Sequence, residues 1–228
     1  MGQSSQRPLG PTDRAPTPSR KGWLTAEFAL LYLGIPLAIA LFLPRGMLFP
    51  ALFAFTICGL IVLALTGYNW RGISHGWGKV RWGMVALFGL LVGVVGAAIM
   101  AVLSGQGFHA PTPARLRFLA VLWLLYPLLS ALPQELIFRT LFFHRYRTLL
   151  PDPRHAVLLN AAIFSFAHLM YWSVVVLVLT FVGGLIFARA YQKYGFPMVW
   201  MLHAVAGNML FSVGMGWYFW SGNVVRPF

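Results

Sequence analysis

Acidic residues are almost absent from this chain. Its 228 residues include 17 lysines and arginines but only 4 acids, and 59% of all residues are hydrophobic. No soluble core needs that much apolar side chain, so the soluble enzyme and soluble binding-module classes are excluded. Several apolar runs reach about 20 residues, which is the length that crosses a bilayer as a helix. The composition therefore predicts an all-α fold, a polytopic membrane helical bundle.

Cysteine is also scarce, and no soluble basic surface is present. Cys58 is the single cysteine, so an internal disulfide is excluded. A formal net charge of +13 is also typical of proteins that bind nucleic acid. Here, however, the basic residues lie mostly in the N-terminal segment and at the ends of apolar runs. That distribution is typical of the positive-inside rule. We therefore expect the lipid bilayer, and no nucleic acid, as a partner.

The chain divides into two regions by composition. Residues 1–22 are rich in Pro, Ser, Gln and Arg and predict a disordered basic N-terminal tail, without a cleaved signal peptide. Residues 23–228 predict a single transmembrane domain. The Lys and Arg bias predicts a multi-pass protein of the cell (inner) membrane, with its N-terminal tail in the cytoplasm.

The apolar runs predict about seven to eight transmembrane helices. Pro133 is expected to interrupt the fourth run and to start a further helix over 134–150, which counts as a half-span. The predicted spans are 23–43, 47–65, 82–103, 114–133, 155–172, 173–194 and 197–220. Gly89 and Gly93 in the third span form a GxxxG pattern, which favours close packing of two helices.

One carboxylate lies deep among apolar residues. Asp13 lies in the tail, Asp152 in a polar turn and Glu27 near the start of the first span, which leaves Glu135 alone within a later one. An ionisable group at membrane depth is costly and indicates a functional site by default. Arg139 lies four residues on and is its nearest predicted partner. Such a Glu–Arg pair can also be purely structural.

Two histidines recur in the later spans. With a rise of about 1.5 Å per residue, Glu135 and His168 lie at similar depth on two antiparallel helices, and His203, followed by Asn208, comes from a third helix. A carboxylate and a histidine can activate water, and a second histidine and an amide can stabilise an oxyanion, so the set suits peptide hydrolysis without a metal. Alternatively, Glu135, His168 and His203 could hold zinc, because two His and one Glu form a known catalytic ligand set. Neither an HExxH nor a GxSxG motif is present.

These residues resemble a known family in order and spacing. Gln134-Glu135-x-x-x-Arg139, Phe164-x-x-x-His168 and His203 with the nearby Asn208 are similar to the EExxxR, FxxxH and HxxxN or HxxxD motifs of CPBP intramembrane proteases. This family, also called Abi, is related to the type II CAAX prenyl endopeptidases, and the resemblance covers about residues 116–222.

The resemblance implies a glutamic-type intramembrane endopeptidase that needs no cofactor. Its substrate would be a membrane protein or a lipidated peptide. By resemblance, the glutamate and His168 activate water, His203 and Asn208 stabilise the oxyanion, and Arg139 orders the acidic motif.

Two positions depart from the family pattern. Gln134 replaces the first glutamate, and an amide cannot act as a carboxylate base. Gly207 stands four residues after His203, where the family pattern has its Asn or Asp, and Asn208 lies about 140° from His203 around a helix unless a bulge brings it round. Either Glu135 takes the role of the base, or the chain is a catalytically impaired membrane scaffold or immunity-type protein. A third hypothesis, a small transporter or proton relay, is disfavoured because no internal repeat is visible.

Overall fold

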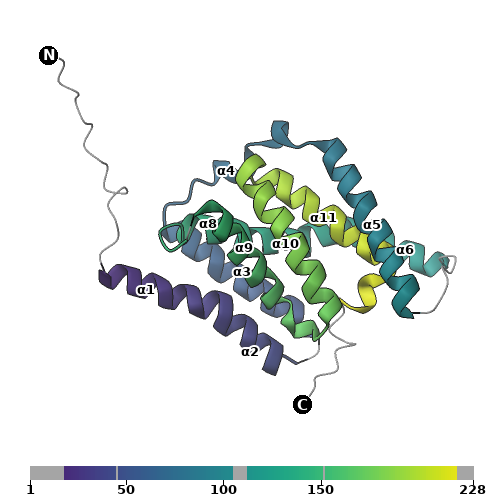
Figure 1. Ribbon diagram of the computed structural model, residues 1–228, viewed down its shortest axis with the longest axis horizontal. Helices are drawn as coiled ribbons and strands as arrows, with labels where there is room; N and C mark the ends of the chain where they lie inside the picture. The colour runs from purple at the N-terminus through teal and green to yellow at the C-terminus, as the bar shows by residue number, and fades with distance from the viewer. Residues whose placement is uncertain (1–17, 45, 105–111, 151, 220–228) are drawn as a thin grey trace.

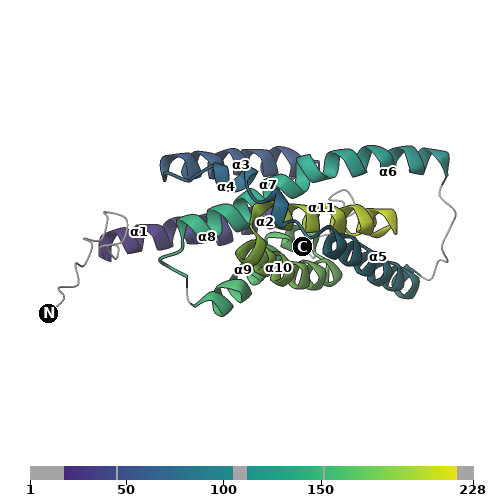
Figure 2. The same cartoon turned by 90° about the horizontal axis from the view of Figure 1, so that it is seen from above.

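A long helical stretch from Pro113 to Arg145 runs through the molecule in the computed structural model (Figure 2). The structure describes residues 18–44, 46–104, 112–150 and 152–219, and no strand occurs among them. Figure 1 shows the bundle of helices. The predicted all-α, polytopic membrane bundle is confirmed.

The described α-helices are α1 (Pro18–Ala29), α2 (Ile35–Phe42), α3 (Leu48–Leu65), α4 (Arg71–Ser74), α5 (Trp82–Ser104), α6 (Pro113–Tyr126), α7 (Leu132–Glu135), α8 (Phe142–Arg145), α9 (Pro153–Ala167), α10 (Val174–Tyr194) and α11 (Phe196–Ser212). Wider π-helical turns occur at η1 (Leu30–Gly34), η3 (Pro127–Ala131) and η4 (Leu136–Leu141). Short 3-10 turns occur at η2 (Trp77–Lys79), η5 (Leu169–Tyr171) and η6 (Met215–Trp217).

Among the described residues, five helical stretches are long and apolar enough to cross a bilayer. They are Ser19–Phe42, Leu48–Leu65, Trp82–Leu103, Pro113–Arg145 and Val174–Tyr194. The helices α9 and α11, predicted as spans, have only 15 and 17 residues. Both are shorter than the roughly 20 residues that a straight spanning helix needs, and α11 buries ten of its residues inside the bundle. Five of the predicted seven to eight spans therefore meet the length requirement.

The predicted break at Pro133 is wrong. Helical structure continues without interruption from Pro113 to Arg145 and ends five residues before the predicted end at 150. Proline removes one N–H donor and crowds the preceding turn, but the wide turns η3 and η4 lie on either side of Pro133 and accommodate this distortion.

Side chains of other helices bind the backbone carbonyls along this distorted stretch. Trp200 Nε1 donates to the carbonyl of Pro127 over 2.7 Å, and the Tyr32 hydroxyl donates to that of Ile137 over 2.8 Å. The distorted helix is therefore held by hydrogen bonds from α11 and from η1, which a protein in lipid needs because water cannot satisfy free carbonyls.

Both ends of the predicted map also differ from the structure. Helix α1 begins at Pro18, inside the segment 1–22 that was expected to be a disordered tail, while residues 1–17 lie outside the described part. Helix α11 ends at Ser212, and turns and η6 follow over residues 213–219, where the helix was predicted to continue.

Two of the acidic residues have structural roles. The Glu27 carboxylate accepts two hydrogen bonds from Arg145, at 3.0 and 2.9 Å, and one from the Tyr146 hydroxyl at 2.7 Å. This cluster ties α1 to the end of the long helical stretch. Asp152 caps α9 by accepting from the backbone N–H groups of Arg154 and His155. The His155 side chain, followed by these backbone groups, lowers the pKa of the Asp152 carboxyl.

Small residues set how closely the helices approach one another. Gly89 and Gly93 of α5 face α11, where an added Cβ would come within 2.8 Å of Val205 and 2.6 Å of Met209, so the predicted packing role of the GxxxG pattern is confirmed. Helix α10 packs against both α9 and α11 (Figure 1). Gly184 of α10 lies so close to α9 that a Cβ would come within 2.9 Å of the Ala161 Cα.

We therefore expect Gly184→Ala to lower the free energy of unfolding by about 1–3 kcal/mol, because backbone cannot move aside as a flexible side chain can. The adjacent Gly183→Ala is the matched control, since its Cβ would make only ordinary contacts with Phe187, the nearest at 3.5 Å. Denaturant titration of both variants in detergent measures the difference. Equal stability of the two would contradict the close approach.

Candidate active site

A fully buried carboxylate joins the long helical stretch to α11. Glu135 ends α7, and its Oε1 lies 2.7 Å from His203 Nδ1 on α11. Glu135 is 0% exposed and His203 is 5% exposed. An ionised carboxylate only accepts hydrogen bonds, so the proton of this contact belongs to Nδ1 of His203. The contact therefore leaves Nε2 of His203 as the nitrogen that can accept a proton.

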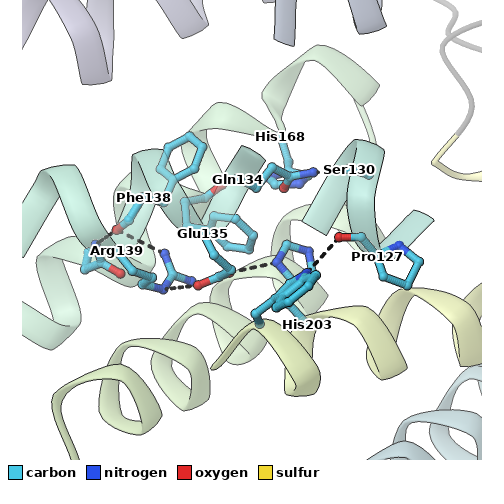
Figure 3. Close-up of polar contacts among 11 residues, drawn as sticks. Pro127, Ser130, Gln134, Glu135, Phe138, Arg139, His168 and His203 are labelled. Atoms are coloured by element: carbon cyan, nitrogen blue, oxygen red, sulfur yellow. Dashed lines mark hydrogen bonds and ion pairs between the residues drawn. The ribbon is translucent and has the colours of Figure 1, made fainter. Parts of the chain in front are cut away.

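Arg139 neutralises the same carboxylate from the other side. Its Nε lies 3.5 Å from Glu135 Oε2, and neither side chain is exposed. Its Nη1 donates to the carbonyl of Phe138 over 3.3 Å. The guanidinium also lies over the ring of Phe164, 4.6 Å from the centroid. The predicted Glu135–Arg139 pair is thus present, and His203 completes a three-residue cluster with it (Figure 3).

His168 lies at the C-terminal end of α9, where the helix changes to the turn η5. Its Nδ1 lies 2.7 Å from the carbonyl of Phe164 and must donate to it, because a carbonyl only accepts. Nε2 of His168 is therefore also an acceptor. Among the described residues, neither His168 nor His203 has a hydrogen-bond partner at Nε2.

The ring of Phe164 brings the two histidines together. Its centroid lies 4.7 Å from that of His168 and 5.7 Å from that of His203. Phe187 of α10 stacks on the ring of His203, with 5.0 Å between the centroids. Arg139, His168 and His203, which come from three separate segments, therefore meet around the ring of Phe164.

A large apolar cavity of about 2160 Å³ borders this cluster. Its polar lining includes Gln134, His168 and His203, together with Tyr126 and Ser130. Glu135 and Arg139 do not line it. They lie behind the wall, so the carboxylate acts on the cavity through His203.

Gln134, where the family pattern has a glutamate, does lie on the cavity wall. Its Nε2 donates to the Ser130 hydroxyl over 3.0 Å, and its Oε1 has no hydrogen-bond partner in the described structure. Tyr126, Ser130 and Gln134 follow one another at intervals of four residues and form one polar stripe on the long helical stretch. The four-residue spacing places Tyr126 and Ser130 on the same helix face as Gln134 and can be seen in the sequence. The predicted site did not include these two residues.

Asn208 is not directed at the cavity. Its Nδ2 donates to the carbonyl of Trp123 on α6 over 3.2 Å, and the residue is not part of the cavity lining. Helix α11 is α-helical from Phe196 to Ser212, without the bulge that could have turned Asn208 toward His203. The space beside Gly207 is filled by the ring of Tyr126.

The three residues named as zinc ligands do not converge on one point. No group of three or more His, Cys, Asp or Glu side chains in the described part of the chain is placed to hold a metal ion. Both oxygens of Glu135 are directed at protein groups, one at His203 Nδ1 and one at the Arg139 guanidinium. A cation bound there would meet the positive charge of Arg139, so this arrangement does not fit a metal.

We expect Arg139→Met to destabilise the protein by about 3–5 kcal/mol, because it leaves the buried Glu135 carboxylate without its cationic partner. The double variant Arg139→Met/Glu135→Gln should recover a large part of that loss, since it removes the unpaired charge. Unfolding in detergent measures both. A double variant as unstable as Arg139→Met would show that the charge is not what Arg139 neutralises.

Comparison with known proteins identifies the segment that carries the site. Residues 116–210 match the model of the family described as type II CAAX prenyl endopeptidase Rce1-like. Neither the curated proteins nor the solved structures gave a match. The family match contains all three motifs and confirms the resemblance on which the sequence prediction rested. Residues 116–210 of this multi-pass membrane protein are therefore similar to the type II CAAX prenyl endopeptidase Rce1-like family, a family of proteases.

Proposed function

We propose that this protein is an intramembrane endopeptidase in which His203, held by Glu135, takes the proton from the attacking water. The observation that carries the proposal is the 2.7 Å contact between Glu135 Oε1 and His203 Nδ1 at the wall of the apolar cavity. A carboxylate that accepts from Nδ1 fixes the tautomer and stabilises the imidazolium that forms when Nε2 is protonated.

The reaction follows from these proton positions. The water oxygen forms a bond to the peptide carbonyl carbon, its proton passes to His203 Nε2, and the carbonyl electron pair moves to oxygen as an oxyanion. His168 Nε2 accepts the second O–H of the water and orients it. When the tetrahedral intermediate collapses, the C–N bond breaks and the proton on His203 passes to the leaving amine. Glu135 stays ionised throughout.

This assignment differs from the roles that the resemblance implied. There, the glutamate and His168 activate water and His203 binds the oxyanion. The geometry favours His203 as the base instead, because Glu135 contacts His203 and does not line the cavity. The reaction needs no metal in this account, and zinc is not assigned to the site.

The substrate class follows from the cavity. Its lining consists mostly of Leu, Val, Ala and Phe side chains from α3, α5, α6, α10 and α11, with Arg115 as its one charged residue among those described. Such a space accepts an apolar polypeptide or a lipid chain rather than a polar loop. We therefore propose a membrane-associated, lipidated protein as substrate. We propose the cell membrane as the location, with the N-terminus in the cytoplasm.

The test compares protein termini in host membranes that contain the wild-type chain, Glu135→Gln or His203→Gln at matched levels. New termini should appear with the wild type and fall by at least about 100-fold in each variant, and the double variant should be no worse than either single one. Full cleavage by His203→Gln would overturn the proposal. Cys58→Ala, at an exposed position away from the cavity lining, is the control for folding and expression.

A catalytically impaired scaffold is the second candidate, and the position of Gln134 favours it. This amide lies on the cavity wall, where the family pattern calls for a carboxylate. If the wild type gives no new termini and Gln134→Glu does, the chain is an impaired member of its family. If the wild type gives them and Gln134→Glu does not increase them, the Glu135–His203 assignment holds.

A further inference from the structure

Tyr126 stands on the cavity wall beside His203 and has no role in the reaction described so far. It ends α6, and its ring centroid lies 6.2 Å from that of His203 and 5.6 Å from that of Phe211. Ser130 follows it by four residues and accepts a hydrogen bond from Gln134, four residues further on. Tyr126 is therefore the first member of a polar stripe that ends beside the candidate site.

The position of the phenol hydroxyl is fixed by a glycine of α11. A Cβ built on Gly207 would come within 2.1 Å of two ring carbons of Tyr126 and within 2.4 Å of its hydroxyl oxygen. Gly207 follows His203 by four residues, so both lie on one face of α11. The Tyr126 hydroxyl thus lies against this face, one helical turn from the proposed base.

Peptide hydrolysis needs a hydrogen-bond donor for the oxyanion, and Asn208 and the two histidines direct their protons to other groups. The Asn208 amide donates to Trp123, and the Nδ1 protons of His203 and His168 go to Glu135 and Phe164. The Nε2 atoms of both histidines are acceptors when the reaction begins. A phenol O–H beside His203 supplies what these groups do not.

We propose that Tyr126 donates its hydroxyl proton in a hydrogen bond to the oxyanion of the tetrahedral intermediate, a role that rests on the endopeptidase function proposed above. As water adds, the carbonyl electron pair moves onto oxygen, and the Tyr126 O–H turns toward it. The proton stays on Tyr126, and no bond to Tyr126 forms or breaks. Preorganised donors of this kind contribute in the transition state and little to ground-state binding.

The test uses Tyr126→Phe, which keeps the ring over Gly207 and removes only the hydroxyl. The protein is reconstituted in liposomes with a pool of internally quenched membrane peptides, some farnesylated and some unmodified. We expect kcat to fall by about 100- to 1000-fold with KM and thermal stability unchanged. Tyr171→Phe is the matched control, because Tyr171 also lines the cavity but lies beside His168, 6.1 Å between ring centroids.

A size exchange gives a second, independent readout. Tyr126→Ala should lose activity. The double variant Tyr126→Ala/Gly207→Asn should be at least tenfold more active than Tyr126→Ala (roughly 1.4 kcal/mol of transition-state stabilisation). The amide then occupies the vacated space and offers an N–H donor. Gly207→Asn alone should destabilise the protein, since its side chain meets the Tyr126 ring.

The outcomes separate this proposal from the proposed function. Wild-type cleavage with an unchanged kcat in Tyr126→Phe overturns the oxyanion role and leaves the endopeptidase intact. An equal loss in Tyr126→Phe and Tyr171→Phe overturns it as well, because the loss is then not specific to the position beside His203. Absence of cleavage by the wild type on every peptide removes the endopeptidase function and, with it, this role.

Discussion

The Glu135 carboxylate, shared between Arg139 and His203, is the constraint on which the rest of the site depends. A lone carboxylate at this depth is costly, and one arginine four residues away neutralises it. The pairing leaves the second oxygen for His203, a residue of the cavity wall, where it fixes the imidazole tautomer and leaves Nε2 as the acceptor. The same charge pair therefore stabilises the fold and prepares the histidine for proton transfer.

The distorted long helical stretch gives this cluster its geometry. Its π-helical turns leave carbonyls that are satisfied by side chains from three other parts of the chain: Tyr32 at η1, Asn160 on α9 and Trp200 on α11. Each of these bonds also fixes the helix against a neighbour. In lipid, where water cannot replace a lost partner, such bonds hold Gln134 on the cavity wall and Glu135 behind it.

Much of the architecture could be read from local patterns, because apolar length and the Glu135–Arg139 spacing act within one helix. The motifs also identified the segments that meet at the site. The uninterrupted passage through Pro133 could not be read in this way, since it depends on π turns and on donors from distant helices. For the same reason, sequence could not assign Glu135 to His203 rather than to His168. Successive residues point about 100° apart around a helix, so a shift by one residue changes which side chain faces the cavity. The spacing of Tyr126, Ser130 and Gln134 could be read from the sequence, but the place of Tyr126 beside His203 could not, because it depends on the space above Gly207 in the packed structure.

The most direct test of the account is the tautomer of His203, observed by ¹⁵N NMR of the imidazole nitrogens in lipid nanodiscs. The account predicts a proton on Nδ1 and a bare Nε2 for His203 in the wild type. It also predicts a change toward the Nε2–H form in Glu135→Ala, because the acceptor for Nδ1 is then gone. His168, whose Nδ1 donates to a backbone carbonyl, should keep its tautomer in both proteins. A His203 signal that does not change between wild type and Glu135→Ala would contradict the central claim that this carboxylate sets the state of the proposed base.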